Sequence, residues 1–235
     1  MRLTRLYNLW LHFPFDRPQY TMKTTTRFAL TLLMTAAMSS AMAEGGDAAA
    51  GQKKAAMCIG CHGIVGYQAS FPQIYKVPMI SGQGAEYITA ALTGYKSGER
   101  KHPTMRGIAA SLTDQDMADL GAFYASQKGT PAAAAPQPSA QVAELLKKGN
   151  CASCHGDNYN KPIAGTYPKL AGQHADYLYV ALTAYQAEGK ATSGRGNAVM
   201  AAQAKPFSHK ELKAIAGYIA SLPSELTVVP NAKMR

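Results

Sequence analysis

The chain has 235 residues, enough for one large domain or two small ones, and 47% of them are hydrophobic, which is ordinary for a globular protein. Ala and Gly are abundant while Val and Ile are sparse, which favours helices over strands. The formal net charge is +10, yet there is no dense run of Lys and Arg and no basic–aromatic pattern of the kind found in nucleic-acid-binding proteins. Composition and charge therefore exclude a nucleic-acid-binding protein and favour a soluble helical one.

The first 43 residues are predicted to be a targeting sequence. A charged stretch begins at Met22, an apolar stretch runs from Phe28 to about Met38, and small residues end at Ala43. This order is typical of a secretory signal peptide, and it predicts a true start at Met22, cleavage after Ala43 and an exported protein. An uncleaved membrane anchor is the alternative, but the apolar stretch is shorter than the roughly 20 residues that a membrane span needs.

Removal of this segment also lowers the charge. Its five Lys and Arg side chains stand against one Asp, so the remainder of the chain carries +6 rather than +10. A moderate positive charge fits weak docking to acidic proteins and is compatible with peripheral association with an anionic membrane surface.

The rest of the chain is predicted to form two small helical units. The first, residues 44–127, has expected helices at 47–57 and 86–96 and a closing helix that starts at Thr113. Residues 128–140 are rich in Pro and Ala and predict a linker. The second, residues 141–223, has expected helices at 140–150, which runs into the second cysteine motif, at 175–187 and from Ser208 onward; residues 224–235 form a tail. Asp116 and Glu211 stand three residues after Thr113 and Ser208, which is the pattern of a capping box.

All four cysteines occur in two copies of one pentapeptide, Cys58-Ile59-Gly60-Cys61-His62 and Cys151-Ala152-Ser153-Cys154-His155. C-x-x-C-H is the attachment motif of haem c, in which two thiols reach the two vinyl groups on one edge of the porphyrin and the histidine ligates the iron. The sequence therefore predicts two covalently bound haem c groups. They are attached to Cys58, Cys61, Cys151 and Cys154, and their irons are ligated by His62 and His155.

Other uses of these cysteines fit less well. A thioredoxin-like redox pair needs one C-x-x-C among alternating strands and helices, a pattern that the sequence lacks. A zinc ribbon needs its two cysteine pairs about 15–20 residues apart, whereas Cys61 and Cys151 are 90 residues apart. Two short-loop disulfides would leave the repeated histidine unexplained.

An internal repeat with a period near 90–95 residues identifies candidates for the other axial ligands. The two haem motifs lie 93 residues apart, Tyr87 pairs with Tyr177 at an offset of 90, and Met105 pairs with Met200 at an offset of 95. We call residues 44–127 the first repeat and residues 141–223 the second repeat.

The sixth ligand of a haem c iron is usually a methionine sulfur or a histidine nitrogen. The first repeat offers four candidates, which are Met79, Met105, Met117 and His102. Only Met105 pairs with a ligating residue, Met200, because the other three align with Lys169, Leu212 and Asn197. We therefore predict that Met105 and Met200 are the sixth ligands and that Met117 fills the core. The second-repeat rivals His174 and His209 are expected at the surface.

A ligating histidine usually donates its other ring N–H to a carbonyl. Pro78 follows His62 by 16 residues and Pro168 follows His155 by 13, so the carbonyls of these prolines are candidate acceptors. The alternative is that the prolines only turn the chain.

The chain resembles the diheme cytochrome c4 family, a duplicated class I cytochrome c of bacterial periplasms. The resemblance is carried by the C-x-x-C-H-G motifs at 58–63 and 151–156, by residues 105–112 and 167–174, and by the closing helix that begins at residue 114. It implies an all-α fold of two tandem class I cytochrome c domains related by a pseudo-twofold, with facing haem propionate edges and His/Met ligation at both irons. Residues 77–81 depart from the family pattern, and the Pro/Ala linker is longer than expected.

Such proteins pass electrons from a membrane quinol oxidoreductase towards a terminal oxidase, so the resemblance implies a periplasmic electron carrier whose partners are membrane-bound respiratory complexes. A dedicated cytochrome subunit of a periplasmic dehydrogenase, of flavoprotein or alcohol type, is the alternative. A diheme peroxidase needs one haem with a vacant or labile site, which the matched Met105 and Met200 argue against. We therefore expect an electron-transfer protein rather than an enzyme.

Overall fold

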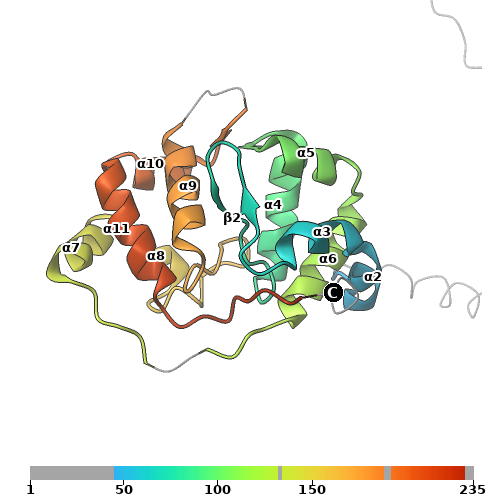
Figure 1. Cartoon of the computed structure of the whole chain (residues 1–235), viewed down its shortest axis with the longest axis horizontal. Helices are drawn as coiled ribbons and strands as arrows, with labels where there is room; N and C mark the ends of the chain where they lie inside the picture. Colours follow the sequence, from blue (N-terminus) through green and yellow to red (C-terminus); the bar gives the residue numbers. More distant parts are fainter. Residues whose placement is uncertain (1–44, 132–133, 188–191, 231–235) are drawn as a thin grey trace, which may run out of the picture. The chain divides into compact units, whose positions relative to one another are not determined.

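The computed structural model of the chain describes residues 45–131, 134–187 and 192–230. The predicted signal peptide, with its start at Met22 and cleavage after Ala43, lies outside these residues. The two repeats follow one another as two sets of helices (Figure 1). The first comprises α2 (Ala48–Lys54), α3 (Ala56–His62), β1 (Gln68–Ala69), β2 (Tyr75–Lys76), α4 (Ala85–Ser97), β3 (Arg100–Lys101), α5 (Pro103–Ala110) and α6 (Asp114–Ser126). The second comprises α7 (Ala140–Lys148), α8 (Ala152–His155), α9 (Ala175–Gln186), β4 (Gly194–Arg195), α10 (Ala198–Ala204) and α11 (His209–Ala220).

The predicted helices are present, with one break. The helix expected at 47–57 ends at Lys54, and a separate helix, α3, carries the first haem motif. Both closing helices begin with the predicted capping box: Asp116 N–H donates to the Thr113 hydroxyl and Glu211 N–H donates to the Ser208 hydroxyl, while each acid accepts from the cap residue's own N–H. These caps satisfy N–H groups that a helix start leaves without partners.

Each repeat has its own apolar core. In the first, α4 and α6 pack against each other around Leu92, Leu120 and Met117. Met117 is 1% exposed, which confirms its predicted role as a core residue. In the second, α9 and α11 pack around Leu178, Leu212 and other apolar side chains. Among the described residues, no helix is both long and apolar enough to cross a membrane.

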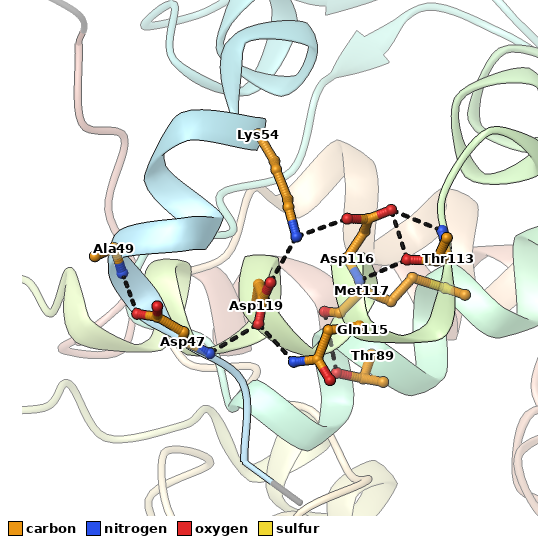
Figure 2. Close-up of polar contacts among 9 residues, drawn as sticks. All are labelled: Asp47, Ala49, Lys54, Thr89, Thr113, Gln115, Asp116, Met117 and Asp119. Atoms are coloured by element: carbon orange, nitrogen blue, oxygen red, sulfur yellow. Dashed lines mark hydrogen bonds and ion pairs between the residues drawn. The ribbon is translucent and has the colours of Figure 1, made fainter. Parts of the chain in front are cut away.

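A polar network fastens the first helix of the first repeat to its last (Figure 2). Lys54 Nζ lies 2.6 Å from a carboxylate oxygen of Asp116 and 2.6 Å from one of Asp119. Asp119 is 2% exposed and also accepts from Asp47 N–H and from the Gln115 amide, each at 2.8 Å. Because a buried carboxylate is costly unless it is fully hydrogen-bonded, these donors stabilise Asp119 in place and hold α2 on α6.

Two reciprocal amide clamps join the repeats. The Gln173 side chain accepts from Met79 N–H at 3.0 Å and donates to Met79 C=O at 2.8 Å. The Gln83 side chain does the same to Lys169, accepting from its N–H at 2.9 Å and donating to its C=O at 3.0 Å. Gln83 and Gln173 are equivalent in the repeat, as are Met79 and Lys169, so the contact has the predicted pseudo-twofold character. Both glutamines are buried, at 4% and 3% exposed.

Other contacts also cross between the repeats. β3 pairs with β4 in antiparallel register, and residues 224–230 of the tail return to the first repeat. There Thr227 N–H donates to Ser81 C=O at 3.0 Å, and Gly129 N–H donates to Glu225 C=O at 2.8 Å. Lys169 Nζ lies 2.6 Å from a Glu225 oxygen and 2.9 Å from Gly82 C=O. The sequence did not predict these strands, which are two residues long, or the return of the tail.

Candidate haem sites

The first haem motif lies on α3, a helix of seven residues. Cys58 and Cys61 are three positions apart on this helix and therefore on one face of it. Cys58 packs against the apolar core of its repeat, and partial burial raises the pKa of its thiol. Neither cysteine takes part in a disulfide, so both sulfurs can form thioether bonds.

The second motif is arranged in the same order on a shorter helix. Cys151 precedes α8, whose last residue is His155. Cys151 packs against the apolar core of the second repeat, and burial raises the pKa of this thiol as well. Gly156 follows at a φ of 80°, a conformation that favours glycine, and turns the chain immediately after the histidine. Each repeat thus places two thiols and one imidazole beside its own core.

Both motif histidines hydrogen-bond to the predicted proline carbonyls. His62 Nδ1 lies 2.8 Å from Pro78 C=O, and His155 Nδ1 lies 3.0 Å from Pro168 C=O. A carbonyl can only accept, so Nδ1 carries the proton in each ring and the Nε2 lone pair is left for a metal. The prediction that these prolines orient the histidines is confirmed.

The surroundings of both imidazoles favour the neutral form. Burial lowers the pKa of His62, against a smaller raising effect of the Pro78 carbonyl. Burial likewise lowers the pKa of His155, which is 6% exposed, against the effect of the Pro168 carbonyl. Because only a neutral imidazole can ligate iron, both histidines are prepared for this role at neutral pH.

The two predicted methionine ligands occupy matching positions on equivalent helices. Met105 is the third residue of α5 and packs against the core cluster that Cys58 also contacts. Met200 is the third residue of α10 and is half-buried. The backbone N–H of each donates to a capping side chain, to His102 Nδ1 at 3.3 Å and to Asn197 Oδ1 at 3.0 Å. The caps fix the start of each helix and with it the place of the methionine.

The rival ligands of the first repeat are engaged elsewhere. His102 Nδ1 accepts from Met105 N–H, and its Nε2 lies 3.0 Å from the Tyr75 hydroxyl, so neither nitrogen keeps a lone pair for iron. Met79 lines a hollow that it shares with residues of the tail, including Leu226. Of the second-repeat rivals, His209 is exposed as expected and contacts the Tyr179 hydroxyl at 2.7 Å. His174 is half-buried rather than at the surface, because it caps α9 next to the buried Gln173.

The residues present fit haem c in both repeats. Each repeat has two cysteines three residues apart that form no disulfide, an imidazole whose Nδ1 is hydrogen-bonded to a carbonyl, and an apolar core beside the cysteines. Sequence reasoning missed the residues that join the two sites, namely the buried glutamines and a pair of arginines on β3 and β4. The repeat held the signal for both pairs, because Gln83 aligns with Gln173 at the offset of 90 and Arg100 with Arg195 at the offset of 95.

Comparison with known proteins agrees with this geometry. The sequence profile of the family described as "Cytochrome c" matches residues 48–128 and again 139–223. The chain is 37% identical over 210 residues to cytochrome c4 of Azotobacter vinelandii, covering 82% of this chain and 97% of that protein. It is 30% identical over 190 residues to a protein of Stutzerimonas stutzeri strain A1501 named "Thiosulfate dehydrogenase electron acceptor", covering 75% of this chain and 84% of that one.

A solved structure shows the same fold. The crystal structure of reduced recombinant cytochrome c4 from Pseudomonas stutzeri matches with a TM-score of 0.55 at 30% identity, and the match covers 76% of this chain and all of that one. The predicted fold of two tandem cytochrome c domains is therefore confirmed, and the chain binds two haem c groups through its two C-x-x-C-H motifs.

Proposed function

This chain belongs to the diheme cytochrome c4 family, and on that premise we propose that it is a periplasmic electron carrier between a membrane-bound respiratory donor and a terminal oxidase or reductase. That it is a diheme c-type electron carrier follows from the family. The proposal adds its compartment, its partners and the direction of transfer. The proposal includes export after cleavage at Ala43. A mature protein whose first residue is not Glu44 would contradict this cleavage site.

One observation carries the proposal: both repeats prepare a proximal histidine in the same way and place a methionine at the same position of an equivalent helix. His62 and His155 each keep Nε2 for iron because Nδ1 is bonded to a proline carbonyl. We propose that the thioether sulfurs of Met105 and Met200 supply the sixth ligands. Each haem, when bound, supplies a one-electron Fe(III)/Fe(II) couple whose potential is raised by methionine ligation.

The remaining residues serve transfer rather than catalysis. With a histidine and a methionine both ligating, neither iron would offer an open position to a substrate, so the protein is not expected to be an enzyme in its own right. The buried glutamine clamps join the two haem-binding repeats. The charge of +6 on residues 44–235 supports brief docking to acidic partner surfaces. We keep 44–127 and 141–223 as the proposed limits of the two domains.

The ligand assignment is tested by replacing each methionine. Met105→Ala and Met200→Ala should each abolish one of two low-spin His/Met spectra and open one iron to CO. Met79→Ala is the control and should leave both spectra intact. Loss of a His/Met spectrum in Met79→Ala but not in Met105→Ala would show that the repeat selects the wrong methionine. The unaltered mature protein should have the added mass of two haems and no reactive thiol.

A second candidate function is that of the dedicated electron acceptor of a periplasmic dehydrogenase. The similarity to a thiosulfate dehydrogenase electron acceptor favours it. The two candidates differ in partner: a free carrier should be reduced by quinol-reduced membranes and should purify alone, whereas a dedicated subunit should co-purify with a larger enzyme and be reduced by that enzyme's substrate. Stopped-flow reduction measured with both donors decides between them.

A further inference from the structure

The side chain that caps α5 differs from the one that caps α10. His102 Nδ1 accepts from Met105 N–H at 3.3 Å. In the second repeat, Asn197 Oδ1 accepts from Met200 N–H at 3.0 Å. An imidazole has a second ring nitrogen, and that of His102 lies 3.0 Å from the Tyr75 hydroxyl. Because Nδ1 accepts, Nε2 carries the proton and donates to this hydroxyl. His102 therefore joins the start of α5 to β2.

Aromatic side chains of the first repeat hold the His102 ring in this orientation. The ring centres of Phe71 and Tyr95 lie 6.2 Å and 6.4 Å from that of His102, both edge-on. Tyr75 is 5% exposed, so few solvent molecules can replace His102 as a partner of its hydroxyl. Because a buried polar group that loses its partner costs free energy, the place of the Tyr75 hydroxyl fixes the place of the His102 ring.

β2 also contacts the second repeat, where it lies beside α9 (Figure 1). Lys76 N–H donates to a carboxylate oxygen of Asp176, in the first turn of α9, at 2.9 Å. The ring centre of Tyr75 lies 6.2 Å from that of Tyr177 on the same helix. A continuous set of contacts therefore runs from α9 of the second repeat, through Tyr75 and His102, to the backbone of Met105.

The second repeat has no equivalent set of contacts to Met200. At the repeat offset of 90, Tyr75 aligns with Gly165, which has no side chain to offer. A Cβ at Gly165 would collide with the carboxylate of Glu86, so a side chain of the first repeat occupies that space. The two methionines thus hold matching positions on their helices, but only the cap of Met105 is braced by the other repeat.

We infer that Tyr75 and His102 are positioning residues that make the placement of Met105, but not of Met200, depend on the contact between β2 and α9. Met105 is the third residue of α5, so the cap that fixes the first turn of this helix also fixes its side chain. Loss of the bond between Tyr75 and His102 frees the ring, loosens that turn and weakens the hold of the sulfur on iron. This inference deepens the proposed function and rests on it, because it takes Met105 as a sixth ligand.

The test measures how readily imidazole displaces each methionine from ferric iron in the intact holoprotein. The NMR ε-methyl resonances of the two ligating methionines are assigned by their loss in Met105→Ala and Met200→Ala, and each is followed separately as imidazole is added. His102→Ala removes the cap, so the affinity for imidazole at the haem of the first repeat should rise about fivefold, the effect of a typical lost helix cap. The affinity at the other haem should not change.

Two milder variants separate the cap from its brace. Tyr75→Phe removes only the hydroxyl and keeps the ring that packs on Tyr177. His102→Asn keeps a cap of the kind that Asn197 provides and removes the imidazole that reaches Tyr75. Each should raise the affinity for imidazole at the haem of the first repeat about threefold, the effect of one lost hydrogen bond.

A change in the second repeat provides the most specific test. Asp176→Ala removes the acceptor of Lys76 N–H on α9 and should raise the affinity for imidazole at the haem of the first repeat about twofold, through the weaker anchoring of β2. The Met200 resonance should respond to imidazole as in the unaltered protein. Glu144→Ala removes an exposed acid of the same repeat, is the matched control and should change neither affinity.

The outcomes that overturn the inference differ from those that overturn the ligand assignment. If Met105→Ala retains both methionine resonances, Met105 is not a ligand and the inference fails with the assignment. If Met105→Ala loses one resonance but Tyr75→Phe leaves the affinity for imidazole unchanged, the inference alone fails. Equal increases at both haems in Tyr75→Phe or Asp176→Ala would also overturn it, because they would show a general loosening of the protein.

Discussion

The two repeats join their first and last helices by different means. In the first, Gly51 of α2 sits against the backbone of Asp119 in α6, and Lys54 reaches that residue's carboxylate. In the second, Glu144 and Ala214 take the places of Gly51 and Asp119. Glu144 is exposed, and Ala214 packs against the apolar core.

The second repeat fastens its first helix with apolar contacts instead. Leu145 of α7 is 7% exposed and packs in the same core cluster as Phe207, and Lys148 Nζ lies 4.8 Å from the centre of the Phe207 ring. The same cysteine–histidine motif is thus supported in one repeat by a close helix crossing with an ionic network around the buried Asp119, and in the other by leucine packing. The haem-binding groups do not depend on either solution, so the repeats should differ in stability while sharing their chemistry.

Gly51→Ala should cause the largest difference in stability between the two repeats. A Cβ at this position would collide with the Asp119 carbonyl and lie 2.8 Å from Phe123 Cβ, so the helices must separate. Overpacking of this kind costs about 3 kcal/mol, despite the better helix propensity of alanine. Hydrogen exchange of the α2 amides in the holoprotein should accelerate accordingly. Glu144→Ala is the matched control in α7, and an equal loss of protection there would show that the two crossings do not differ.

Asp119→Asn should weaken the first repeat less. The amide keeps the shape of the side chain and one acceptor, but it loses the charge that binds Lys54 at 2.6 Å. Hydrogen bonds to a charged group contribute about 2 kcal/mol, so the free energy of unfolding of the first repeat should fall by about that amount. Denaturant unfolding followed by exchange at α2 measures it. Asp114→Asn, an exposed change on the same helix, should have no effect, and similar losses from both would argue against the network.

Mild acid should cause a smaller difference in stability between the two repeats. Hydrogen bonding to Lys54 holds the pKa of both Asp116 and Asp119 below the usual range of a carboxyl. A carboxyl whose folded pKa is depressed stabilises the fold above its unfolded pKa of about 4, and this stabilisation is lost as the pH falls. The protection of α2 should therefore decline faster than that of α7 between about pH 5 and pH 3. The protection of α2 should decline less steeply with falling pH in Asp119→Asn. Equal declines for α2 and α7 in the unaltered protein would contradict the expectation.

The smallest effect is expected from making the junction symmetric. Lys169 stands where the first repeat has Met79, and its Nζ binds both Glu225 and Gly82 C=O. Lys169→Met removes this ion pair, at about 1 kcal/mol or less, while the backbone atoms that the Gln83 clamp uses remain. Exchange of the Thr227 amide should accelerate severalfold, and exchange within α11 should not change. An unchanged exchange rate of the Thr227 amide would mean that Lys169 does not hold the tail. Lys210→Met, a change at an exposed lysine, is the control and should leave that rate unchanged.

Local signals in the sequence sufficed for the haem motifs, the helix caps and the proline acceptors of His62 and His155, because each depends on residues at most 16 positions apart in the chain. The repeat then separated Met105 and Met200 from other methionines, and their ligation stays a prediction. The Lys54 network joins residues 65 positions apart, and β3 and β4 are two residues long. No periodicity marks such contacts, since they depend on how the packed helices meet. The repeat showed that Arg100 and Arg195 are equivalent, but only the register of β3 and β4 shows that they lie opposite each other.

The return of the tail gives the molecule a second connection between its halves. Glu225 C=O accepts from Gly129 at the start of the linker, and Thr227 pairs with Ser81 of the first repeat. A proteolytic nick within the Pro/Ala-rich linker would therefore yield two fragments that remain associated, with the C-terminal fragment anchored to its partner by the tail and by the amide clamps. The peptide link between the haem-bearing halves sets their order in the chain, whereas noncovalent contacts hold them as one body.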